Sequence, residues 1–491
     1  MRDGKAARTR RVGYRGCLSV IALSLVQEQT GNRCNGISSA LGAKRIFHPR
    51  TQLPLPTLDP VLCCTARQEA TARMGSETMA QTEALQHALT SIDVSDPSLY
   101  QQDSWRPLFS QLRRDDPVHY CAASRFGPYW SVTRYDDIFA VELDYENYSS
   151  SSELGGIQVT DQPKGRELAN FIRMDPPGHT AQRRTVAPIV APSNLANFEP
   201  LIRKRTAGVL DALPRGETFD WVTRVSVELT NMMLATLFDF PWADRERLTW
   251  WSDVAIANVD SPDAVVHSED ARFAELAKMG EYFRKLWDAR ADAPPAFDLI
   301  SMLAHAAATR NMPPREFIGT LALLIVGGND TTRNSMSGGL MALVENPEQF
   351  ELVRSRHELI PNLVAEIIRY QTPVLHMRRT ARNDVELAGR RIAKGDKVVM
   401  WYISGNRDEE KIERADEFIV DRPKPRQHLS FGAGIHRCVG DRLAEQQLRI
   451  LWEEVLRRNF RFKIMGPPQR LYSNFIRGIR ALPVQIIPQG A

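Results

Sequence analysis

The chain has 491 residues, of which 43% are apolar and 25% charged, so its composition is that of a folded protein with room for more than one domain. Residues 1–78 hold 12 Lys/Arg against 5 Asp/Glu, a net of +7, which leaves −3 for residues 79–491. The net positive charge of the whole chain therefore gives no indication of nucleic-acid binding by the main body, and we expect none. The longest apolar runs, such as residues 321–326, are far shorter than the roughly 20 residues of a spanning helix, which predicts no transmembrane anchor.

The first 78 residues differ in character from the rest. A basic lead followed by an apolar run ending near residue 26 resembles a secretory signal, but no small-residue cleavage pattern follows it. The stretch through Pro60 has no sustained period, and Met74 or Met79 offers a more natural start. We interpret residues 1–78 as a disordered or mis-assigned extension; a targeting segment and a folded element are the alternatives. Residues 79–491 are predicted to form one catalytic domain.

Cysteine is distributed as unevenly as charge. Four of the six cysteines lie in residues 1–78, which leaves Cys121 and Cys438 in more than 400 residues. Two cysteines cannot form a disulfide framework, so we expect a reducing compartment and a cytoplasmic protein.

The main body is rich in helical patterns, with shorter β-like pieces near residues 117–145 and 374–402. Residues 313–345 predict a single helix of about 30 residues, roughly 45 Å long. Pro314 fits its first turn and Pro347 follows its end. A helix this long and apolar must run through the interior, so we expect a mainly helical domain with a small β-rich part.

The segment "MDPPGHTAQRR" begins a predicted helix. Asp175 is expected to cap it, with Pro176 in the first turn. His179 and Arg183 follow at a spacing of four, on one face. An ordinary surface histidine is the alternative for His179.

The middle of the long helix carries the sequence "GGNDTT", residues 327–332. A Thr hydroxyl inside a helix can divert a backbone hydrogen bond and kink the helix, and the neighbouring Asp330 and Thr331 could relay protons. A tightly packed helix crossing with a surface aspartate would produce the same pattern. Downstream, Glu366 and Arg369 lie on one helix face, which by itself is typical of a surface ion pair.

Cys438 stands just before a predicted helix over residues 441–459. Unpaired N–H groups and the helix dipole at such a position favour the thiolate. Gly434 and Gly440 leave space for a flat ligand, and Phe431 and His436 add an aromatic cover and a cation or hydrogen-bond donor. A buried structural cysteine is the alternative, whereas zinc is disfavoured because no second Cys or His has zinc spacing.

These residues resemble the cytochrome P-450 family. Phe431, Gly434, His436, Cys438 and Gly440 match F-x-x-G-x-[HR]-x-C-x-G, the haem-ligand signature of that family. The "GGNDTT" segment is similar to its oxygen-activation segment, and "EIIR" to its E-x-x-R motif, in family order. Further matches to the family's meander are Asn406, Phe418 and Arg422.

The resemblance covers about residues 85–487 and implies a mainly α triangular-prism fold with a small β-rich part. It implies haem b (iron protoporphyrin IX) with Cys438 as axial ligand, whose thiolate favours O–O cleavage. Asp330 and Thr331 are then expected to deliver protons during oxygen activation, and Glu366 and Arg369 to form a buried ion pair tied to the meander. The implied cofactor-binding residues are His179, Arg183, Arg379 with Arg378 as neighbouring alternative, His436, Phe431, Gly434 and Gly440.

Finer resemblance is to the bacterial alkane-hydroxylase branch, carried by "LLIVGGNDTTRNSMSGG" and "YSNFIRGIRALPVQI". It implies terminal (omega) hydroxylation of medium-chain alkanes or fatty acids, using O2. A terpene or sterol-type substrate is one alternative; an enzyme that uses peroxide or isomerises its substrate and a non-catalytic haem sensor or carrier are others. The candidate substrate-binding residues, each equally compatible with the core, are Ile157, Leu323, Gly327, Val374, Leu375, Met377 and Phe475.

Electrons are expected from a separate protein. Only 53 residues follow Cys438, too few for a flavin or iron–sulfur domain, and no iron–sulfur cysteine spacing precedes residue 79. The resemblance implies a ferredoxin and a ferredoxin reductase supplied by NAD(P)H.

Overall fold

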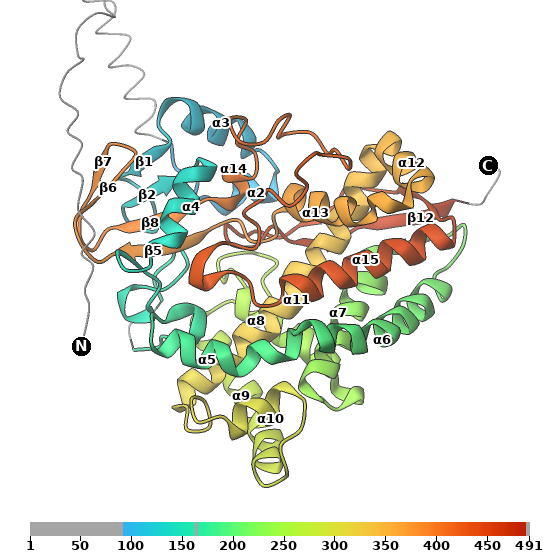
Figure 1. Ribbon diagram of the computed structural model, residues 1–491, viewed down its shortest axis with the longest axis horizontal. Helices are drawn as coiled ribbons and strands as arrows, with labels where there is room; N and C mark the ends of the chain where they lie inside the picture. The colour runs from blue at the N-terminus through green and yellow to red at the C-terminus, as the bar shows by residue number, and fades with distance from the viewer. Residues whose placement is uncertain (1–91, 163–164, 488–491) are drawn as a thin grey trace, which may run out of the picture. The chain divides into compact units, whose positions relative to one another are not determined.

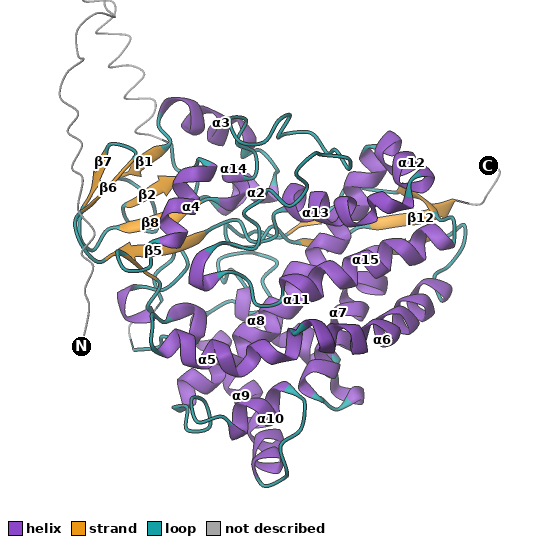
Figure 2. Cartoon of the chain, viewed as in Figure 1, coloured by secondary structure: helices purple, strands orange, loops and turns teal. Residues whose placement is uncertain are grey.

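The computed structural model describes residues 92–162 and 165–487, which belong to one compact unit, Gly75–Ala491. The expectations for residues 1–78, including the boundary at residue 78, lie outside the described residues. Helices make up most of the regular structure, and the strands are short (Figure 2). The predicted mainly α fold with a small β-rich part is therefore confirmed.

The helices come from all parts of the described chain (Figure 1). In chain order they are α2 (Pro97–Gln101), α3 (Arg106–Asp115), α4 (Tyr135–Leu143), α5 (Gly178–Val186), α6 (Pro192–Asp211), α7 (Glu228–Phe238), α8 (Glu246–Ile256), α9 (Glu269–Ala291), α10 (Leu299–His305), α11 (Pro314–Glu345), α12 (Pro347–Ser355), α13 (Ile360–Gln371), α14 (Tyr402–Gly405) and α15 (Asp441–Arg457).

The strands are concentrated in residues 118–149 and 377–487, with β4 between these two stretches. They are β1 (Val118–Cys121), β2 (Tyr129–Val132), β3 (Tyr148–Ser149), β4 (Thr218–Asp220), β5 (Met377–Ala381), β6 (Val385–Leu387), β7 (Arg390–Ile392), β8 (Lys397–Met400), β9 (Arg461–Ile464), β10 (Gln469–Arg470), β11 (Ile479–Ala481) and β12 (Pro483–Ile487). The largest sheet has the order β1-β2-β8-β5-β3, in which only β2 and β8 pair in parallel. Its strand β5 carries Arg378 and Arg379, both of which are buried.

The predicted long helix is confirmed as α11, an uninterrupted helix of 32 residues, about 48 Å long. Pro314 lies in its first turn and Asn346 caps its end, as the sequence indicates. Close helix crossings occur in its second half: a Cβ on Gly338 would lie 2.2 Å from Gln371 Oε1, and one on Gly339 would lie 2.8 Å from the Ile367 side chain. Only glycine allows α13 to approach this closely.

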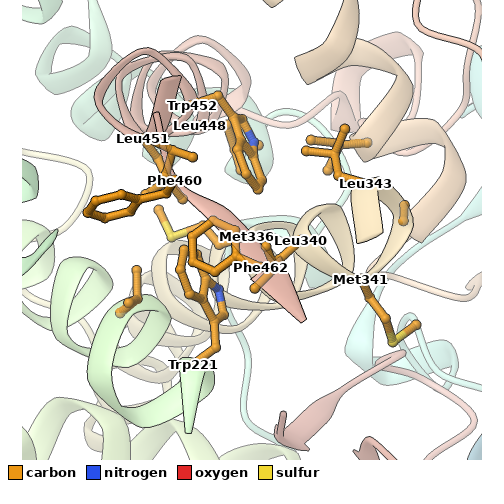
Figure 3. Close-up of a cluster of buried hydrophobic side chains, with 14 of the residues drawn as sticks. Trp221, Met336, Leu340, Met341, Leu343, Leu448, Leu451, Trp452, Phe460 and Phe462 are labelled. Atoms are coloured by element: carbon orange, nitrogen blue, oxygen red, sulfur yellow. The ribbon is translucent and has the colours of Figure 1, made fainter. Parts of the chain in front are cut away.

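The largest core cluster lies where α11 packs against α13, α15 and β9 (Figure 3). Leu340 of α11 and Leu448, Leu451 and Trp452 of α15 are all fully buried. These side chains anchor α15, and therefore also the loop that precedes it and carries Cys438. Among the helices of the described residues, none is both long and apolar enough to cross a membrane.

Candidate active site

The candidate site is a cavity between the middle of α11 and the cysteine loop, residues 428–440. Cys438, Phe431 and Gly440 form one wall, and Gly327 and Thr331 of α11 form the opposite wall. The sequence motifs therefore meet across one cavity although more than 100 residues separate them.

The neighbouring glycines Gly327 and Gly328 of α11 have different surroundings. A Cβ on Gly327 would meet nothing within 4 Å, and the same holds for Gly440 on the facing wall. By contrast, a Cβ on Gly328 would lie 2.7 Å from the Leu234 side chain of α7. The tight crossing that the sequence offered as an alternative therefore applies to Gly328, whereas Gly327 opens onto the cavity.

Thr331 and Asp330 point to different places. Thr331 lines the cavity, and its Oγ1 donates to the Gly327 carbonyl at 3.0 Å. The Asp330 carboxylate is fully buried between α11 and α8, where it accepts from Ser252 at 2.5 Å and from Arg333. The two side chains that the resemblance assigns to one relay thus do not share the cavity.

The polar cluster behind the cavity leads outward. Arg333 contacts Asp330, and it also contacts Asp253 at 2.9 Å. The side chain of Asp253 is one-third exposed. Burial raises the pKa of Asp330 against the lowering influence of Arg333. A carboxyl group whose pKa is raised can carry a proton, and Asp253 joins this cluster to the surface.

Cys438 precedes α15, as expected, and its backbone N–H donates to the Phe431 carbonyl at 2.8 Å. The side chain is exposed, and it lines the cavity. The surrounding protein raises the pKa of the thiol to about 11, although a backbone hydrogen bond from Gly440 lowers it. The backbone hydrogen bond acts in the direction that the helix start predicts, whereas burial raises the pKa, so a bound metal cation would be needed to hold the thiolate form.

The predicted anion-binding residues gather beside the cysteine loop. Arg183 donates to the Arg437 carbonyl at 2.5 Å, and Arg379 and His436 also line the cavity. The rings of His179 and His436 lie 4.4 Å apart. Burial, reinforced by Arg183, lowers the pKa of His179, and burial with Arg379 lowers the pKa of His436 to about 2. Both shifts favour the neutral imidazole, so His436 would contribute hydrogen bonds rather than charge.

This edge fits the two propionates of haem b. Three buried ring nitrogens, both of His179 and Nδ1 of His436, have no hydrogen-bond partner within the described residues. Such groups are costly unless a ligand satisfies them. Arg183 and Arg379 supply positive charge beside them, and the open faces of Gly327 and Gly440 leave room for a flat ring.

Two sequence-based assignments near this edge need adjustment. Asp175 does not cap α5, because its carboxylate accepts from the Ser149 hydroxyl and from the Ser150 N–H at 3.1 Å. Arg378, the alternative to Arg379, faces the other side of β5 and donates to Asp161 at 2.5 Å. Alternation along the strand separates the two arginines, so Arg379 is the one that lines the cavity.

Glu366 and Arg369 form a fully buried bidentate pair on α13, at 2.7 and 2.8 Å. Arg422 of the meander donates to the same carboxylate at 3.0 Å, and Arg369 donates to the Asn406 carbonyl at 2.8 Å. The surface-pair alternative is thus excluded. The pair fixes the loop that leads to the cysteine.

Five of the seven candidate substrate-binding residues line the cavity: Ile157, Leu323, Gly327, Val374 and Met377. Leu375 and Phe475 do not. Leu375 is fully buried in another core cluster, and Phe475 packs against His376. Phe171 and Ile172 also line the cavity, but the sequence could not predict this. An apolar residue at such a position is as typical of the hydrophobic core as of a binding cavity.

Comparisons with known proteins agree with this geometry. The family model "Cytochrome P450" matches residues 263–483. The chain is 38% identical over 410 residues to linalool 8-monooxygenase of Pseudomonas putida, covering 81% of the chain and 99% of that protein. It is 31% identical over 436 residues to methyl-branched lipid omega-hydroxylase of Mycobacterium tuberculosis, covering 84% of the chain and 99% of that protein.

A solved structure, cytochrome P450-153 from Novosphingobium aromaticivorans, is 49% identical with a TM-score of 0.76, covering 80% of this chain and 99% of that one. Identity of this level over almost the whole length of a relative, together with a cysteine facing the predicted haem cavity, leaves one conclusion. The chain belongs to the cytochrome P450 family, as a monooxygenase whose haem has a cysteine thiolate as axial ligand.

Proposed function

We propose that this enzyme hydroxylates the terminal carbon of medium-chain alkanes or fatty acids. The observation that carries the proposal is the composition of the cavity wall. Around Thr331 the wall is apolar, with Ile157, Leu323, Val374 and Met377, and no acidic residue lies among the described lining residues. Such a wall binds a substrate by removing its methylene groups from water, at about 0.8 kcal/mol per CH2.

Haem, when bound, supplies the activation of O2 and the insertion of one oxygen atom into a C–H bond. In the proposal, the protein excludes water and holds one end of the apolar chain near Thr331. The Thr331 hydroxyl passes protons inward, and Asp330 replenishes them after its side chain turns from Ser252. Electrons come from a separate ferredoxin and its reductase. Arg437 and Arg442, which are exposed and close to Cys438 in the chain, favour an acidic partner protein.

The substrates for which the relatives are named are apolar, as in the proposal. One relative is named for omega-hydroxylation of a methyl-branched lipid, which agrees with a terminal position. Another is named for linalool, so a terpene remains the second candidate, favoured by 38% identity.

The test is product analysis of the haem-loaded enzyme with ferredoxin, reductase and NADH. Octane, octanoic acid and linalool are supplied separately, and gas chromatography identifies the alcohols. We expect 1-octanol or 8-hydroxyoctanoic acid as main product. Faster hydroxylation of linalool would favour the terpene alternative. Turnover with peroxide alone would indicate an enzyme that needs no redox partner. The absence of any product would indicate a haem sensor or carrier.

Two variants test the wall itself. Leu323→Phe narrows the cavity and should weaken the spectral binding of octane. Leu375→Met changes a buried residue that does not line the cavity and should leave octane binding unchanged. Equal effects of the two substitutions would contradict the proposed binding site.

A further inference from the structure

A buried carboxylate that no sequence motif indicates lies behind the cofactor edge. Glu142, in the last turn of α4, is 2% exposed. Its Oε2 accepts from Arg379 Nη2 at 3.0 Å, and its Oε1 accepts from the Tyr402 hydroxyl. Arg379 and Tyr402 both line the cavity, so Glu142 lies directly behind two of its wall residues.

Glu142 also touches the cysteine loop. A Cβ on Gly432 would lie 3.6 Å from Glu142 Oε1, and a Cβ on Gly434 would lie 2.5 Å from the Glu142 backbone carbonyl. Gly434 additionally has φ +62°, which favours glycine. Thus one residue of α4 connects the cysteine loop, β5 and α14.

Arg379 has more hydrogen-bond donors than its partners within the protein use. Arg379 uses Nη1 on the Arg378 carbonyl at 2.9 Å and Nη2 on Glu142, and a guanidinium has five N–H donors. Donors therefore remain for a propionate in the cavity. A propionate bound by Arg379 would therefore share the positive charge of this guanidinium with Glu142.

We propose that Glu142 is a positioning residue for haem: held by Tyr402, it orients Arg379 toward a propionate, and its negative charge lowers the haem reduction potential. A negative charge in a low-dielectric interior disfavours the gain of an electron by iron, and hydrogen bonds around a cofactor are among the means by which proteins set its potential. Partners that orient a ligand-binding side chain typically change affinity by about 10–100-fold when removed. This role does not depend on which substrate the enzyme uses.

The experiment uses the full chain loaded with haem, and complete loading is checked by the spectrum of the reduced carbonyl complex. Glu142→Gln removes the charge, Glu142→Asp keeps the charge but withdraws it from Arg379, and Tyr402→Phe removes one donor. Glu454→Gln is the matched control, because Glu454 of α15 is similarly buried, accepts from Arg458 directly after that helix and does not line the cavity.

Two quantities are measured: the reduction potential by spectroelectrochemical titration, and the rate of haem transfer to apomyoglobin. We expect Glu142→Gln to raise the potential, and Glu142→Asp and Tyr402→Phe to speed haem release about tenfold or more with smaller changes of potential. Glu454→Gln should change neither. A wild-type potential in Glu142→Gln, or an equal shift in Glu454→Gln, overturns the electrostatic role; wild-type release rates in Glu142→Asp and Tyr402→Phe overturn the positioning role.

Discussion

Replacing Glu366 by Gln tests how much of the stability depends on the ion pair of α13. The substitution preserves the shape of the side chain but removes the charge that balances Arg369, which is 1% exposed. Arg422 loses its carboxylate partner at the same time. Removing one member of a buried pair costs about 3–5 kcal/mol, because the remaining charge is desolvated without compensation.

That cost is a large part of the roughly 5–15 kcal/mol by which folded proteins are stable. The loss should first affect residues 406–422, because Arg369 donates to the carbonyls of Asn406, Ala415 and Glu417. The haem-ligating loop follows directly in the chain. We therefore expect weakened haem retention together with reduced stability.

The assay is equilibrium unfolding in urea, followed by circular dichroism at constant haem concentration, since a bound ligand shifts apparent stability. Glu351→Gln is the control: Glu351 pairs with Arg461 at 2.6 Å, but both side chains are about half exposed. Pairs of this kind contribute about 0.2–1 kcal/mol. If Glu366→Gln destabilises the protein no more than Glu351→Gln does, the reasoning about the buried pair is wrong.

Four other substitutions or deletions have definite expected outcomes. Thr331→Ala should keep the substrate-induced spin shift but divert reducing equivalents to peroxide, measured as alcohol formed per NADH consumed; Thr332→Ala, which removes a neighbouring hydroxyl, is its control, and full coupling in Thr331→Ala contradicts the proton-delivery role. Cys438→Ala should lose the strongly red-shifted Soret band of the reduced carbonyl complex, and its retention would refute thiolate ligation. Gly434→Ala should lower haem occupancy, because its Cβ would collide with the Glu142 carbonyl, whereas Gly440→Ala, which meets no protein atom, should fold normally. A chain that starts at Met79 should bind haem as the full chain does, and failure to fold would contradict the expected dispensability of residues 1–78.

Several features could be predicted from the sequence because they depend on local chemistry. The bounds of α11 follow from Pro314 and Pro347, since proline acts on its own turn of backbone. Cys438 could be recognised because Phe431 and Gly440, which line the cavity with it, are also its neighbours in the chain; Gly434 instead packs against Glu142. The pairing of Glu366 with Arg369 follows from helix geometry alone.

Other features depended on contacts between distant segments, which no local pattern encodes. Whether a glycine opens a cavity or admits a helix is decided by the opposing element, and this separates Gly327 from Gly328. The burial of Asp330 against α8 depends in the same way on Ser252, 78 residues away.

The sequence by itself determined the family, the thiolate ligand and the long helix, because residues close in the chain carry those signals. Only the tertiary structure decided that Arg379 rather than Arg378 lines the cavity, that Leu375 belongs to the core, and that Glu142 lies behind the cofactor edge. The physical reason is that side-chain direction and charge compensation arise only when α4, β5 and the cysteine loop pack together. Glu142 and Arg379 are 237 positions apart in the sequence, and no local pattern encodes their contact.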